Sequence, residues 1–130
     1  MNTTQKCACS GAPDLMFACS GAADTAEIAD RAVRQVNKDR LAKMYCLAGI
    51  GGRVESILVN AQAANSITAV DGCDSDCARR TLEQAGFKGF AHIRVTDLGM
   101  EKGNSEVTPE RIAVVAERVR STLRGQTTGE

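Results

Sequence analysis

The sequence predicts a single-domain α/β fold, a three-layer sandwich around a mainly parallel four-stranded sheet. Short apolar segments alternate four times with longer amphipathic segments, a pattern typical of βαβ units. The 130 residues, 43% of them apolar, suit one domain with one core. Right-handed crossovers between such strands produce a parallel sheet with helices on both faces, as in Rossmann-like or flavodoxin-like domains.

The predicted strands are short and rich in apolar or β-branched residues. They cover residues 14–18, 42–45, 66–70 and 90–96. The third has the composition of a strand buried on both faces. We expect the second strand to run beside the first.

The predicted helices cover residues 22–40, 53–64, 78–85 and 108–124. In the first, second and last of these, apolar residues recur at the spacing of one helix face. Gly86 ends the third, while Thr108 and Pro109 provide an N-cap and a first helical residue for the last. The glycine-rich segment 49–52 is predicted to be a tight turn, and residues 99–107 a polar loop.

Composition narrows the class of protein. The 16 basic and 16 acidic residues cancel, which argues against nucleic acid or an anionic membrane as a partner. The sequence has neither an apolar run long enough to span a membrane nor the apolar centre of a signal peptide, so we expect a cytoplasmic protein. Six cysteines in such a protein indicate metal or redox chemistry more than structural disulfides.

The cysteines mark one edge of the predicted sheet. Cys19 and Cys46 directly follow strands, and Cys73 follows the third strand after Asp71-Gly72. The carboxyl ends of parallel strands meet at one edge, where sites form in such sheets. Cys77 lies one helical turn after Cys73 at a helix N-terminus, which favours the thiolate. Four thiolates brought together predict a tetrahedral zinc site, with iron or an iron–sulfur cluster as a less favoured occupant.

Other interpretations of the same residues stay open. Cysteine is often a small buried apolar residue with no further role. Alternatively, Cys73 or Cys77 is the reactive thiolate of a thiol redox or sulfur-handling enzyme. The spacing from Cys73 to Arg79 matches a cysteine-based phosphate loop, but Asp74 and Asp76 would repel phosphate there.

The only histidine, His92, is predicted within a strand and away from the cysteine edge, as a packed or surface residue.

Four motifs together resemble the DGC-domain family of candidate zinc-binding proteins, which is named for its Asp-Gly-Cys sequence. They are Ala18-Cys19-Ser20-Gly21, Cys46-Leu47-Ala48-Gly49-Ile50-Gly51, Asp71-Gly72-Cys73 with Cys77-Ala78, and Thr96-Asp97-Leu98-Gly99. The resemblance spans residues 15–102 and implies four chelating cysteines, Cys19, Cys46, Cys73 and Cys77, without an established activity. Many relatives carry a further cysteine where this chain has Ala22.

The predicted organisation is therefore an N-terminal tail over residues 1–13, one α/β zinc-binding domain over 14–124 and a C-terminal tail over 125–130. Cys7 and Cys9 fall in the first tail, outside the family motifs. The predicted partner is a metal ion.

Overall fold

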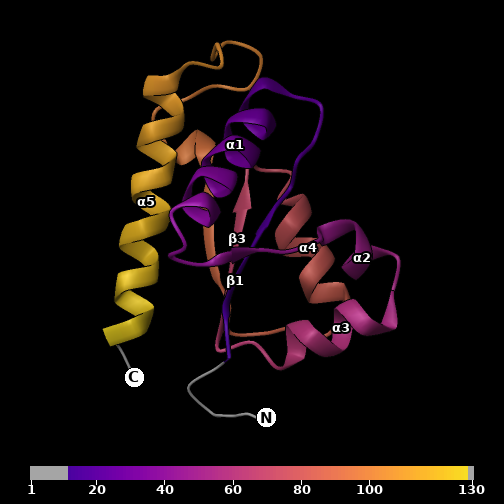
Figure 1. Ribbon diagram of the computed structural model, residues 1–130. Coiled ribbons are helices and arrows are strands. Elements are labelled where there is room, and N and C mark those ends of the chain that lie inside the picture. The colour runs from indigo at the N-terminus through magenta and orange to yellow at the C-terminus, as the bar shows by residue number, and fades with distance from the viewer. Residues whose placement is uncertain (1–11, 129–130) are drawn as a thin grey trace.

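The computed structural model describes residues 12–128 and has a four-stranded, all-parallel sheet at its centre (Figure 1). The strands are β1 (Asp14–Ala18), β2 (Lys43–Met44), β3 (Ser66–Asp71) and β4 (Ala91–Arg94). Their order is β2-β1-β3-β4, and every neighbouring pair is parallel. The predicted α/β class and the position of the second strand beside the first are confirmed.

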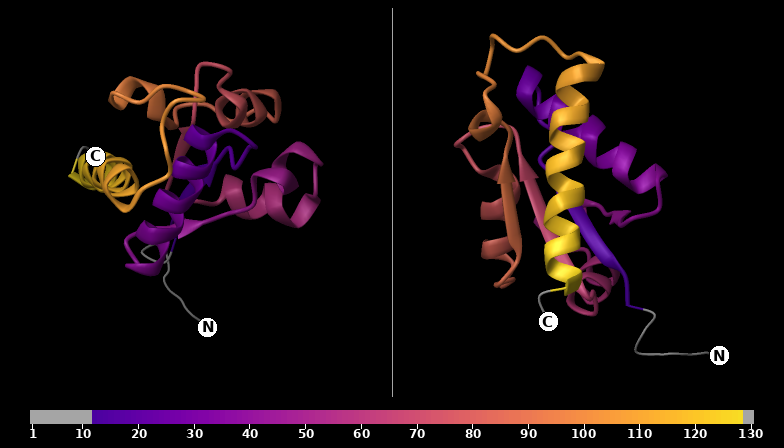
Figure 2. Two further views of the ribbon diagram at one scale, coloured as in Figure 1. Left: turned by 90° about the horizontal axis from the view of Figure 1, so that it is seen from above. Right: turned by 90° about the vertical axis from the view of Figure 1, so that its left-hand side faces the viewer.

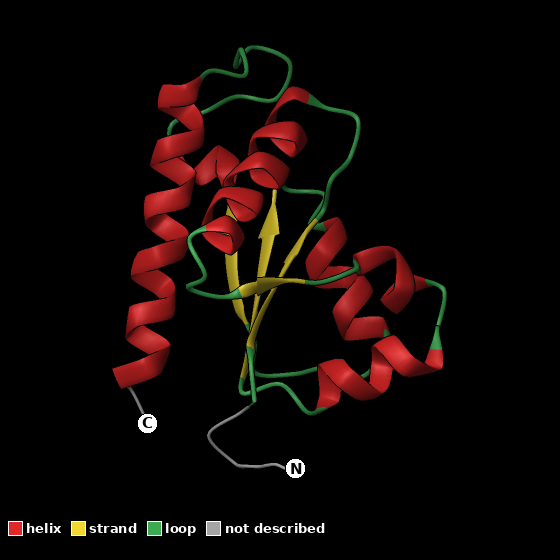
Figure 3. Ribbon diagram, viewed as in Figure 1, coloured by secondary structure: helices red, strands yellow, loops and turns green. Residues whose placement is uncertain are grey.

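Helices cover both faces of the sheet, so the predicted three layers are present (Figures 2 and 3). On one face lie α1 (Asp24–Lys38) and α5 (Pro109–Thr128), and on the other lie α2 (Leu47–Gly51), α3 (Glu55–Gln62) and α4 (Cys77–Gln84). Within the described residues, no helix is long and apolar enough to cross a membrane.

Strand β1 shows how the two cores are built. Successive side chains of a strand point to opposite faces. Met16 and Ala18 therefore pack with α1 and α5, whereas Leu15 and Phe17 pack with the core formed by α2, α3 and α4. All four side chains are almost completely buried, so β1 is covered on both faces.

Three elements differ from the sequence prediction. The glycine-rich segment is the helix α2 instead of a turn, because Cys46 Sγ accepts a hydrogen bond from Gly49 N at 3.3 Å and caps it. A Cβ at Gly49 would overlap Ile57, so glycine here permits close packing of α3. The last strand ends at Arg94 and continues as the 3₁₀ helix η2 (Val95–Leu98). Helix α5 extends to Thr128, beyond the end expected at residue 124.

Gly72 brings the β3–α4 loop (residues 72–76) into contact with the start of α1. A Cβ at this position would lie 2.6 Å from Ala26 N and 2.8 Å from Thr25 C, both backbone atoms. Backbone cannot move aside as a flexible side chain can, so a larger residue must shift the loop or the helix.

We therefore expect Gly72→Ala to lower the free energy of unfolding by about 1–3 kcal/mol, measured by urea denaturation. Gly125→Ala is the matched control, because a Cβ at Gly125 in α5 meets no atom within 4 Å. It should leave stability unchanged or slightly raised. Equal stability of the Gly72 variant and the wild-type protein would contradict the close approach.

Candidate functional site

Asp71, the last residue of β3, has a buried carboxylate that holds the start of α4. It is only 1% exposed. Its Oδ1 accepts a hydrogen bond from Ala78 N at 2.6 Å, and its Oδ2 accepts one from Arg79 N at 3.1 Å. These amides belong to the first turn of α4 and have no partner within the helix, so the carboxylate both satisfies them and faces the positive end of the helix dipole.

A second buried carboxylate, Asp76, closes the loop that Asp71 begins. Asp76 has a φ of +54°, a left-handed conformation that aspartate and asparagine tolerate better than most residues. Arg94 donates to it from both Nε, at 3.0 Å, and Nη2, at 2.8 Å. These hydrogen bonds from Arg94 lower the pKa of Asp76, and they outweigh the opposing effect of burial.

His92 connects the two carboxylates. Its Nε2 lies 2.9 Å from Asp71 Oδ2 and 3.5 Å from Asp76 Oδ1. The prediction that His92 lies away from the cysteine edge is therefore wrong, because β4 pairs with β3 so that Arg94 lies opposite Asp71 and His92 opposite Ala69. His92 and Arg94 are two residues apart and share a face, which is the sequence signal that could have revealed both.

Asp71, Asp76 and His92 form the only group of three or more potential ligand atoms within 4.8 Å of one another in residues 12–128. The group fits a metal ion poorly. The Asp71 oxygens already accept from two amides, and the guanidinium of Arg94 supplies the positive charge beside Asp76. Its chemistry is that of a satisfied buried network that fixes the β3–α4 loop.

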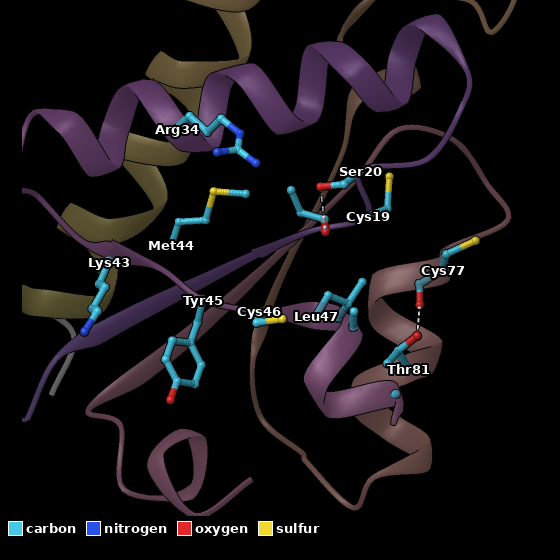
Figure 4. A pocket seen from close by; sticks show the side chains of 13 residues that line it. Cys19, Ser20, Arg34, Lys43, Met44, Tyr45, Cys46, Leu47, Cys77 and Thr81 are labelled. Carbon is cyan, nitrogen blue, oxygen red and sulfur yellow. Dashed lines mark hydrogen bonds between the residues drawn. The ribbon is translucent and has the colours of Figure 1, made fainter. Parts of the chain in front are cut away.

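Three of the four predicted cysteine ligands line one open pocket of about 890 Å³ at the carboxyl edge of the sheet. Cys19 follows β1, Cys46 caps α2 and Cys77 is the first residue of α4 (Figure 4). Cys46 and Cys77 are exposed, while Cys19 is half-buried. The predicted convergence of separate strand ends therefore brings these three residues to one pocket.

The sulfur atoms themselves are not gathered at a point. No three cysteine sulfurs of the described chain lie within 4.8 Å of one another. Figure 4 shows the Cys46 sulfur directed toward Leu47, whereas the Cys77 sulfur points outward, away from Cys46. Cys73 is not part of the pocket lining. Cys7 and Cys9 lie outside the described residues.

The thiols differ in their electrostatic surroundings. Burial raises the pKa of Cys19, although its Sγ accepts a hydrogen bond from Gly72 N at 3.3 Å. Hydrogen bonds from Ser75 lower the pKa of Cys73, and the nearby ammonium of Lys102 lowers it further. The surroundings of Cys73 therefore favour its ionised form.

Arg79 is not available for a phosphate loop with Cys73. Its guanidinium pairs with Asp76 at 3.4 Å and with Glu83 at 3.8 Å. The geometry thus gives no support to the phosphate interpretation of this spacing.

The fold and the pocket define a small α/β protein with cysteines at the carboxyl edge of a parallel sheet. The family model of the DGC domain matches residues 15–119, so the chain belongs to the DGC-domain family, as its motifs predicted. It is similar to the Anaerobic and virulence modulator AnvM of Pseudomonas aeruginosa, with 31% identity over 109 residues that cover 81% of this chain and 83% of AnvM. No solved structure matches the chain.

The ion pair of Asp76 predicts a stability that depends on pH. A carboxyl whose pKa is lowered by folding stabilises the protein fully above its unfolded pKa of about 3.9, and this contribution is lost as the pH falls through the folded-state value. Asp76→Asn keeps the left-handed conformation but removes the charge. We expect it to lower the free energy of unfolding by about 1–3 kcal/mol at pH 7, and by progressively less below about pH 4.

The control is Asp97→Asn, which removes a 63% exposed carboxylate lying 3.7 Å from the same arginine. An exposed ion pair contributes little, so the free energy of unfolding of this variant should match that of the wild-type protein at pH 7 and below about pH 4. Urea denaturation across the pH series measures both variants. A pH-independent loss in the Asp76 variant would show that its charge is not what stabilises the loop.

Proposed function

We propose that the chain binds one zinc ion through Cys19, Cys46 and Cys77, with Cys73 as the fourth and most weakly held ligand. The observation that carries the proposal is the pocket lined by cysteines from three separate strand ends. Zinc prefers four thiolate or imidazole ligands, and the single histidine is already engaged with Asp71. The thiolate-rich donor set also suits iron or an iron–sulfur cluster, which remain the less favoured occupants.

The proposal requires side-chain movements that bring these donors together. Cys46 and Cys77 are exposed, so rotation about their Cα–Cβ bonds between staggered positions meets little packing. Cys19 is held at the base of the site by Gly72 N, the amide next to Cys73. Cys73 directly follows this contact of Cys19 and lies four residues before Cys77, which makes it our candidate for the fourth thiolate.

The name of the relative AnvM points to a biological role for the proposed zinc site. AnvM is named as a modulator. We propose a corresponding regulatory role for this chain, in the cytoplasm where thiols stay reduced. In this proposal three pocket cysteines hold the metal and the fourth cysteine exchanges with other donors. The coordination of the metal then changes with the surrounding solution, which suits regulation and requires no catalytic turnover.

One observation favours a second candidate function, a thiol redox or sulfur-handling enzyme. The lowered pKa of Cys73 favours its thiolate, which is the nucleophilic form. The exposed Cys77 lies four residues away at the start of α4 and could act as its resolving partner. This function uses the same loop without a metal.

Metal analysis of protein purified without chelator separates the two functions. The zinc proposal predicts about one zinc per chain, and it predicts that Cys46→Ser lowers metal affinity at least tenfold because a hydroxyl is a poor zinc donor. The melting temperature should fall with it, and chelation of the wild-type protein should reproduce most of that fall.

The control replaces both Cys7 and Cys9 by serine, which should leave the zinc content unchanged. A proportional loss of zinc in this control would place a ligand in the N-terminal segment. Metal-free wild-type protein with a reversible disulfide between Cys73 and Cys77 would overturn the zinc proposal in favour of thiol chemistry.

A further inference from the structure

The cysteine pocket has a cationic rim that metal binding does not require. Its lining includes Arg34 of α1 and Lys43 of β2 and contains no aspartate or glutamate. Lys43 lies with its Nζ 6.0 Å from the centre of the Tyr45 ring and makes no ion pair within the described part of the chain. Asp30 offsets part of this charge through its ion pair with Arg34, so the rim keeps one excess positive charge, which favours an anion in a pocket whose other notable groups are thiols.

Arg34 is positioned over this pocket by hydrogen bonds that use only one of its nitrogens. Arg34 Nε donates to Asp30 Oδ2 at 2.7 Å, and Ser20 Oγ donates to Asp30 Oδ1 at 2.6 Å. Ser20 follows Cys19, so this chain of contacts ties the guanidinium to a cysteine of the pocket. The two terminal nitrogens of Arg34 have no hydrogen-bond partner among residues 12–128, and Figure 4 shows the guanidinium above the pocket.

Two free guanidinium nitrogens side by side match the two oxygens of a carboxylate. The pocket lining also includes the large apolar side chains of Met44, Tyr45 and Leu47, which suit a short aliphatic segment, and Figure 4 shows Met44 between Arg34 and Cys46. The volume of about 890 Å³ lies within the range of small-molecule sites. A ligand complementary to the whole pocket has a carboxylate at one end and a soft donor for the cysteine site at the other.

We propose that this pocket binds a small thiol that carries a carboxylate, with the carboxylate at Arg34 and the sulfur among Cys19, Cys46 and Cys77. The position of the sulfur rests on the proposed zinc site, whereas the position of the carboxylate depends only on Arg34. The ligand's sulfur occupies the place that Cys73 holds otherwise. The proposed zinc site then responds to the concentration of small carboxylated thiols.

The sequence provides a built-in reporter for binding. Tyr45 is the only tyrosine, the chain has no tryptophan, and Tyr45 lines the pocket. Its fluorescence can be titrated with 3-mercaptopropionate, which has both groups, with 2-mercaptoethanol, which lacks the carboxylate, and with propionate, which lacks the thiol. Each titration is made with zinc-loaded and with chelator-treated full-length protein.

We expect zinc-loaded wild-type protein to bind 3-mercaptopropionate at least tenfold more tightly than either simpler compound. Arg34→Met should remove that advantage without changing the affinity for 2-mercaptoethanol. Arg31→Met is the matched control, because Arg31 lies on the same helix but pairs with Glu27 and does not line the cysteine pocket. Arg34 is 66% exposed on its side chain, so its replacement should leave the fold intact, as circular dichroism will check.

Equal affinity for 3-mercaptopropionate and 2-mercaptoethanol, an equal effect of the two arginine variants, or no binding to the wild-type protein would overturn the proposal. Failure of the zinc proposal has a different signature. In that case the protein takes up no zinc, and Arg34→Met still weakens the binding of propionate and 3-mercaptopropionate by the same factor.

Discussion

The buried carboxylate of Asp71 is the constraint on which the cysteine edge depends. An ionised carboxylate without partners would be costly at this depth, and here two amides of α4 and the ring of His92 surround it. These contacts fix where α4 begins and therefore where Cys77 lies. Asp76 and Arg94 hold the other end of the β3–α4 loop, so the segment that carries Cys73 is anchored on both sides.

The three residues of the Asp-Gly-Cys motif thus have separate physical roles. Asp71 anchors the loop, Gly72 lets it approach the backbone of α1, and Cys73 presents a thiol whose pKa is lowered by Ser75 and Lys102. The amide of Gly72 also donates to the sulfur of Cys19, which links the loop to the end of β1. In this arrangement the carboxylates hold the β3–α4 loop in place, and the thiols are the groups left to bind a metal.

The order of strands and helices and the arrival of three cysteines at one pocket were predictable from the sequence, because periodicity and strand ends are local features. Helix α2 was missed because its glycines favour a turn, and it depends on the Cys46 cap and on packing against Ile57. The pairing of Asp71 with His92 was missed because it depends on the register between β3 and β4. The position of Arg34 at the pocket was also missed, because it depends on how α1 packs across the sheet. Such non-local geometry has no signature in the spacing of single residues.

X-ray absorption at the zinc edge of metal-loaded protein, prepared without added thiols, tests the proposed site most directly. Ligation by Cys19, Cys46, Cys73 and Cys77 predicts a first shell of four sulfur atoms at about 2.3 Å. Substitution of Cys73 by serine should reduce that shell to three sulfurs with one lighter donor. A shell made of nitrogen and oxygen at about 2.0–2.1 Å would contradict a thiolate site.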